Sequence, residues 1–293
     1  MSMHSYINIV ITMIKLLGII SLALLVDGIF RKLLARTQNR IGPPITQSFY
    51  DIIKLFGKKR SDSKGYKNIL FKTIPFLYFI STCSLFLFVL GIAKFEFDFI
   101  MLIYMIILSS ALYILLGLVS NSPFGAFGSM RDMLLMICYE IIMTISLFSF
   151  IIYSDVLTLS EMNESWLILK LPIASLCLFV VALVETRITP FDTAEAEAEI
   201  MGSIETEYSG GNLGFIGLSR QLRFLFFVIL LTRLLFNPSE ILSFILFSVL
   251  IFFVLLFNEA TTARYKADQT FSLLIIILIL SVIEFIRLYF VVW

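Results

Sequence analysis

The sequence is poor in charge. Only 15% of its 293 residues are Asp, Glu, Lys or Arg, whereas 59% are hydrophobic, and the mean hydropathy is +0.99. A water-soluble domain cannot hide so much apolar surface, because too few polar residues remain to cover it. This composition excludes a soluble globular fold. It predicts an all-α integral membrane protein, formed as a single polytopic domain over residues 1–293. No nucleic-acid partner is expected.

Histidine and cysteine are also scarce. The one histidine is His4, and the three cysteines, Cys83, Cys138 and Cys177, lie far apart inside apolar runs. They form no CxxC pair and have no zinc or iron–sulfur spacing, so we expect no cofactor in this chain. In a redox system the electron carriers would lie on other chains. A basic n-region and a small-residue cleavage site are missing too, so the first apolar segment is expected to be retained.

What the sequence has in quantity is long apolar runs, eight of which are long enough to span a bilayer as helices. They cover residues 7–30, 69–93, 98–120, 132–153, 167–186, 213–236, 241–258 and 271–292. An even number of spans places both termini on the same side of the membrane.

Basic residues indicate the orientation of these spans. The 31–67 loop carries ten of the 22 basic residues against Asp51 and Asp62, a net charge of +8. Loops rich in Lys and Arg face the cytoplasm. We therefore predict both termini outside and four cytoplasmic loops, 31–67, 121–131, 187–212 and 259–270.

One segment of the first loop predicts a short amphipathic helix that does not span. Its apolar residues recur at helical spacing, while polar residues face the other way. The apolar set is Ile45, Phe49, Ile52, Ile53 and Phe56, and the polar set is Thr46, Ser48, Asp51 and Lys54. The helix would lie in the membrane interface or pack against a neighbouring subunit.

Carboxylates gather at one place, the stretch VETRITPFDTAEAEAEIMGSIETEY at 184–208. It contains seven of the 21 acidic residues, answered nearby only by Arg187. The seven are Glu185, Asp192, Glu195, Glu197, Glu199, Glu205 and Glu207. Carboxylates crowded in low dielectric cannot all ionise, so such a group shares protons and suits a proton or cation path. A solvated acidic surface loop is the alternative.

Ionisable residues inside apolar spans are costly and need a reason. Glu140 lies within the fourth span, where we interpret it as a proton-relay group and, alternatively, as a helix-packing carboxyl. In the sixth span, Arg220 and Arg223 are i, i+3 neighbours able to reach the acids of the preceding loop. In the last span, Glu284 and Arg287 have the spacing of a structural ion pair.

Four blocks resemble a known family. They are RKLLARTQNRIGPP (31–44), GAFGSMRDMLLMICYE (125–140), VETRITPFDTAEAEAEIMGSIETEYSG (184–210) and ARYKADQ (263–269). In this order they are similar to a membrane subunit that two kinds of complex share. One kind is respiratory complex I, whose NADH–quinone oxidoreductase contains it as the subunit designated 1 or H. The other is the energy-converting membrane-bound [NiFe] hydrogenases with their related sulfane reductases. The family also has eight spans.

The resemblance implies a subunit that anchors a peripheral redox arm and starts a chain of carboxylates toward antiporter-like membrane subunits. It implies iron–sulfur clusters and a [NiFe] centre on partner subunits of a hetero-oligomeric complex in the cell membrane, rather than in the inner mitochondrial membrane. The implied proton-path residues are Glu140, Glu185, Asp192, Glu195, Glu197, Glu199 and Glu207. The implied contacts to the peripheral arm are Arg36, Gln38, Arg40, Arg264, Lys266 and Asp268.

Some positions depart from the pattern of complex I. Phe30 stands where a glutamate is usual at the quinone tunnel, Arg220 replaces another glutamate, and Arg187 with Ile188 replaces Asn-Arg. Pro44 replaces an asparagine. These changes fall where quinone chemistry would occur, so they favour the ferredoxin-dependent, hydrogenase-like branch.

Three alternatives remain. The first is a quinone-binding subunit of an NADH–quinone oxidoreductase. The second is a self-contained secondary ion transporter with Glu140 and Glu185 as its ion site, although we find no internal repeat of the spans. The third is a purely structural anchor.

Overall fold

The computed structural model describes residues 3–59, 69–91, 97–159, 166–193, 202–238 and 240–292, and within these ranges every regular element is a helix. Seven of these helices are long and apolar enough to cross a membrane. They are α1 (Met3–Thr37), α3 (Ile69–Val89), α4 (Asp98–Val119), α5 (Pro123–Ser154), α9 (Gly211–Leu235), α10 (Ile241–Thr261) and α11 (Ala267–Val292). Helices satisfy all their backbone hydrogen bonds internally, which an apolar surrounding demands. The predicted all-α membrane fold is confirmed.

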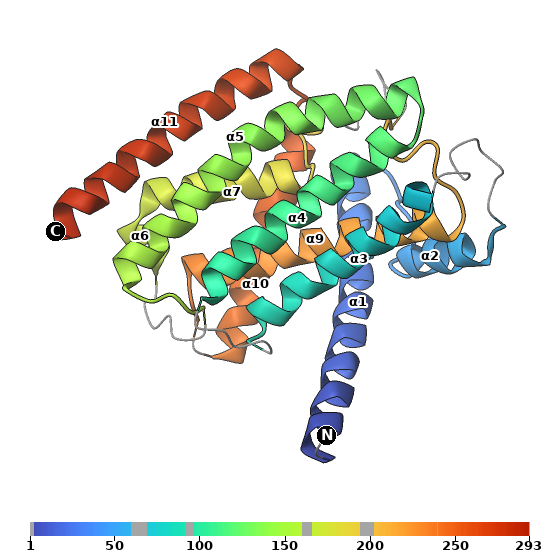
Figure 1. Cartoon of the computed structure of the whole chain (residues 1–293), viewed down its shortest axis with the longest axis horizontal. Coiled ribbons are helices and arrows are strands. Elements are labelled where there is room, and N and C mark those ends of the chain that lie inside the picture. Colours follow the sequence, from blue (N-terminus) through green and yellow to red (C-terminus); the bar gives the residue numbers. More distant parts are fainter. Residues whose placement is uncertain are drawn as a thin grey trace.

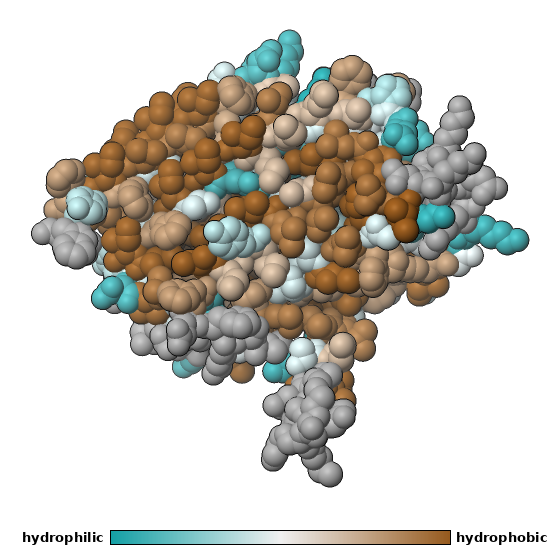
Figure 2. Space-filling view, viewed as in Figure 1, coloured by the Kyte–Doolittle hydropathy of each residue, from teal (hydrophilic) through white to brown (hydrophobic). Residues whose placement is uncertain are grey.

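The helices pack side by side around a shared core of apolar side chains from α3, α4, α5, α7 and α9, while the N-terminal half of α1 extends away from the body (Figure 1). The surface that faces the viewer is mostly hydrophobic, as a lipid-facing surface requires (Figure 2). α4 and α5 approach closely at Gly117, where an added Cβ would lie 2.0 Å from the Ser129 Oγ. Only glycine permits this contact between the two backbones.

Two predicted spans are longer than expected. α1 continues to Thr37, so residues 31–37 are helical rather than loop. α5 begins at Pro123, not at 132. The physical reason is a helix cap: the Ser122 hydroxyl accepts a hydrogen bond from the Gly125 amide at 2.9 Å, and proline is suited to the first helical position. The predicted loop at 121–131 is therefore mostly helix.

The fifth predicted span, 167–186, is not one continuous helix. It divides into α6 (Leu167–Lys170) and α7 (Pro172–Glu185). Pro172 has no backbone N–H and cannot continue the preceding turn, so the helix breaks at Leu171. With 14 residues, α7 is about 21 Å long, shorter than the ~30 Å hydrocarbon core. Its last residue, Glu185, consequently ends inside the bundle.

The predicted amphipathic helix is α2 (Gln47–Gly57), which packs through Ile52 against Leu24 of α1 and Leu218 of α9. One expected orientation is wrong. Ser48, predicted to face away from the apolar side, is fully buried because its hydroxyl donates a 2.7 Å hydrogen bond to Asp27 of α1. Ile53, from the predicted apolar set, is instead 67% exposed.

Candidate functional site: buried ion pairs beside an acidic cavity

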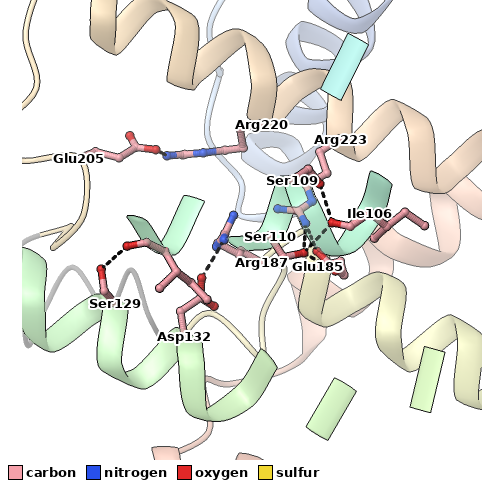
Figure 3. Close-up of polar contacts among 11 residues, drawn as sticks. Ile106, Ser109, Ser110, Ser129, Asp132, Glu185, Arg187, Glu205, Arg220 and Arg223 are labelled. Carbon is pink, nitrogen blue, oxygen red and sulfur yellow. Dashed lines mark hydrogen bonds and ion pairs between the residues drawn. The ribbon is translucent and has the colours of Figure 1, made fainter. Parts of the chain in front are cut away.

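The centre of the bundle contains an ion pair between the end of α7 and the middle of α9. The Arg223 Nη2 lies 2.5 Å from the Glu185 Oε2, and both side chains are 1% exposed. Ser110 of α4 joins the pair (Figure 3): its hydroxyl accepts from Arg223 at 2.5 Å and donates to the Glu185 Oε1 at 3.1 Å. Desolvating two charges costs more than an ordinary contact returns, so a buried pair is weak evidence of stability and is better explained by function.

A second buried pair lies next to the first. Arg187, two residues after Glu185, approaches Asp132 of α5 at 3.0 Å, with side-chain exposures of 6% and 7%. Its guanidinium also covers the ring of Tyr113 on α4, 3.4 Å from the ring centroid, a favourable cation–π geometry. The two pairs share the short segment 185–187, so movement of that segment changes both (Figure 3).

Several polar atoms around these pairs are buried without a hydrogen-bond partner among the described residues. They include the Nε and Nη1 of Arg223, the hydroxyl of Tyr78 and the Oε1 of Glu140. Glu140, on α5, interacts electrostatically with Glu185, Asp132 and Arg223. Buried polar groups of this kind are normally satisfied by ordered water. The interior of the bundle can thus hold water near three carboxylates.

A cavity of about 460 Å³, here called the acidic cavity, opens beside the buried pairs. Its charged lining comes from α1, α2, α9, α10 and the segments after α7. The carboxylates are Asp27, Asp51, Asp192, Glu205 and Glu259, and the guanidiniums are Arg31, Arg187 and Arg220. Because Arg187 lines the cavity and also pairs with Asp132, it connects the cavity to the buried interior.

Ion pairs hold this lining in place. Arg31 bridges Asp27 at 3.0 Å and Asp51 at 3.2 Å, which joins α1 to α2. Arg220 pairs with Glu205. Asp27 also accepts a 3.0 Å hydrogen bond from the Gln221 amide of α9. The carboxylates of the cavity are therefore mostly paired, and their arrangement depends on arginines from two helices.

The structure places the predicted proton-path residues at different depths. Glu185 lies in the central pair, Glu140 is half-buried within the bundle, and Asp192 lines the acidic cavity. Glu207 is half-buried on the loop before α9 and does not line the cavity. The remaining three, Glu195, Glu197 and Glu199, lie outside the described residues.

The pairings expected from the sequence are present. Arg220 and Arg223 reach acids of the preceding segments, at Glu205 and Glu185. Glu284 and Arg287 form an ion pair at 2.6 Å.

The predicted contacts to a peripheral arm are exposed at the same end of the molecule as the acidic cavity. Arg36, Gln38 and Arg40 follow α1, and Lys266 and Asp268 flank the start of α11. Arg264, from the same set, pairs with Asp192 of the cavity lining. The Tyr265 amide donates to the Pro190 carbonyl at 3.1 Å. This surface is thus connected to the cavity, while its contact with an arm stays a prediction.

Sequence reasoning missed Asp27, Asp132 and Glu259, all of which belong to this site. Asp27 and Glu259 lie in or beside apolar runs, where the cost of burying a charge is itself a signal. Asp132 stands at the first residue of a predicted span. The same argument that identified Glu140 applies to each of them.

Comparison with known proteins agrees with this architecture. The model of the NADH dehydrogenase family matches residues 8–289. The H-type subunit of NADH-quinone oxidoreductase from Geobacillus sp. (strain WCH70) is 31% identical over 271 residues, covering 83% of this chain and 81% of that protein. Its counterpart from Bacillus cereus (strain B4264) is 30% identical over 286 residues, covering 89% and 85%.

A solved structure shows the same fold. One chain of the membrane-bound sulfane sulfur reductase, an archaeal respiratory membrane complex, superimposes with a TM-score of 0.87 at 18% identity. The match covers 96% of this chain and 99% of that one. From the family match and the relatives together, the chain belongs to the NADH dehydrogenase family, among the relatives of the H-type subunit of NADH-quinone oxidoreductase.

Proposed function

We propose that this chain is the membrane subunit that connects a peripheral electron-transfer arm to an ion-translocating membrane arm in a complex I-like respiratory complex. The relatives are subunits of NADH-quinone oxidoreductase, and the matching structure is a respiratory membrane complex. The observation that carries the proposal is the continuity of ionisable groups. They run from exposed Arg264, through Asp192 and Arg187, to the buried Glu185 and Glu140.

The mechanism is electrostatic. A redox change in the docked arm alters charge or position at the exposed end of this series. The segment 186–193 carries Arg187 and Asp192, so it transmits the change to the buried pair at Glu185. A shift of Arg223 or Arg187 toward or away from Glu185 changes the proton affinity of the interior carboxylates, since opposite charge favours the ionised form. Glu140 then takes up or releases a proton toward the neighbouring membrane subunits.

The proposed electron-transfer branch is hydrogenase-like and ferredoxin-dependent, with iron–sulfur clusters and a [NiFe] centre on partner subunits. Three positions that depart from the complex I pattern, Phe30, Arg187 and Arg220, all line the acidic cavity. Phe30 packs edge-on against Phe224 at 5.1 Å and Phe252 at 5.6 Å between ring centroids. An aromatic cluster stands where the quinone branch places a carboxylate, which supports a site without a quinone.

Quinone binding is the second candidate. The relatives at 30–31% identity are named for quinone reduction, and the cavity volume of about 460 Å³ falls in the ~300–1,000 Å³ range of small-molecule sites. The intact complex decides between the branches. Inhibition of electron transfer by quinone-site blockers, relieved by added quinone, supports this candidate. Full activity in quinone-free vesicles supports the hydrogenase-like branch.

The coupling role is tested with Glu140→Gln in the intact complex, sealed in vesicles, while electron transfer and ion translocation are recorded together. The expected result is electron transfer near the wild-type rate with translocation lost, because glutamine keeps the shape but cannot exchange a proton. Glu240→Gln is the matched control, an exposed acid at the start of α10. Wild-type translocation in the Glu140 variant would contradict the proposal. Activity of the purified chain alone would instead indicate a self-contained transporter.

A further inference from the structure

We propose that the end of the molecule opposite the acidic cavity binds one anionic phospholipid, whose phosphate is held by Arg233 and whose acyl chain lies in an apolar cavity. This inference is independent of the proposed coupling function. It rests on a second cavity, here called the Arg233 cavity, of about 380 Å³.

The lining of the Arg233 cavity is apolar except for one cation. Phe88, Val89 and Leu90 come from the end of α3, Ile229 from α9 and Phe244 from α10. Arg233, in the last turn of α9, is half-buried in this lining. Within the described part of the chain it makes no ion pair, and its Nε is buried without a hydrogen-bond partner. A desolvated, unpaired guanidinium is costly, so an anion from outside the chain is the natural partner.

The position of the cavity corresponds to the boundary between hydrocarbon and water. Arg220 and Arg233 are 13 residues apart on α9, about 20 Å along the helix axis, so the two cavities lie at opposite ends of it. Trp166, 48% exposed, packs against Phe236, three residues beyond Arg233. Lys170 covers the ring of Tyr153 at 5.6 Å. Exposed Trp, Tyr and Lys at helix ends are typical of the headgroup level of a membrane.

These features match the two-part chemistry of a phospholipid. The planar guanidinium presents two parallel N–H donors to a phosphate, which gives strong, oriented binding. The apolar walls accept hydrocarbon beside the phosphate, which a free phosphate ion or an acidic side chain would leave unused. A lipid with net negative charge is favoured over a zwitterionic one, because no carboxylate among the described lining residues is present to attract a choline group.

The test uses the intact complex in phosphatidylcholine vesicles that contain increasing amounts of a photoactivatable phosphatidylglycerol. Cross-links to residues 88–91 and 229–233 are quantified by mass spectrometry. We expect saturable labelling in the wild type. For Arg233→Gln we expect about fivefold weaker apparent affinity, the factor for about 1 kcal/mol per basic residue at a membrane surface.

Two further variants keep the result interpretable. Ile229→Trp fills the cavity but keeps the cation, and it should also lose labelling. Lys170→Gln removes another cation at the same end and should leave labelling unchanged. The proposal is overturned by wild-type labelling of the Arg233 variant, by equal labelling with photoactivatable phosphatidylcholine, or by displacement with inorganic phosphate, which would show a site for the free ion.

Discussion

The two ends of α9 place the same residue type in opposite circumstances. At one end, Arg220 pairs with Glu205 and Arg223 pairs with Glu185. At the other end, Arg233 lies in an apolar lining without an ion pair in the described chain. The first two arginines connect this helix to segments far away in the sequence, whereas the third points to a molecule outside the chain. What surrounds an arginine, and not its presence in an apolar helix, decides whether it organises the fold or recruits a ligand.

The largest effect is expected from breaking the central pair at one side only. Arg223→Leu leaves the Glu185 carboxylate buried without its counter-ion, which should destabilise the protein by about 3–5 kcal/mol. Unfolding in detergent, followed by helix content against denaturant, measures this. The double variant with Glu185→Leu removes both charges and should recover most of the loss. A double variant no more stable than the single one would show that the pair does not act as a unit.

An intermediate effect is expected at Gly28 of α1, which lets the start of the α2 region lie against the helix. A Cβ at this position would be 1.9 Å from the Ile45 carbonyl oxygen, so Gly28→Ala must move backbone away from the acidic cavity. We expect a loss of about 1–3 kcal/mol, the usual cost of overpacking.

Gly18 on the same helix is the matched control, since nothing lies within 4 Å of its added Cβ. There alanine should stabilise the helix by up to about 1 kcal/mol. Equal effects at both positions would contradict the assigned role of the close approach. The same detergent unfolding assay compares the two.

The smallest effect sharpens the comparison along α9 itself. The Arg220 side chain is 41% exposed, so Arg220→Gln should change the free energy of unfolding by no more than about 1 kcal/mol, as for surface ion pairs generally. Added salt should reduce the difference further, because exposed pairs are screened. A loss as large as that of Arg223→Leu would show that Arg220 is held in a far less polar environment than its exposure indicates.

Helix positions followed from the sequence more readily than helix faces. Seven of the eight apolar runs are single long helices, and the eighth is interrupted at Pro172, a break that proline itself announces. By contrast, Ser48 was assigned to the wrong face of α2, because only the packing of α1 against α2 brings Asp27 within hydrogen-bond reach. The side of the membrane on which each loop lies stays a prediction.

The site shows the same division. Residue spacing alone indicated that Arg220 and Arg223 reach the acids before α9, since both follow closely in the chain. The partners of Arg187, Asp132 on α5 and Tyr113 on α4, are distant in sequence and no spacing rule reaches them.

Hydropathy by itself determined the class of protein, the helices and the presence of costly charges, because each of these depends on the local balance of apolar and polar residues. Tertiary packing decided which charges meet, which cavity they line and which arginine is left without a partner. These outcomes depend on contacts between segments such as α7 and α9, whose energies no single stretch of sequence contains.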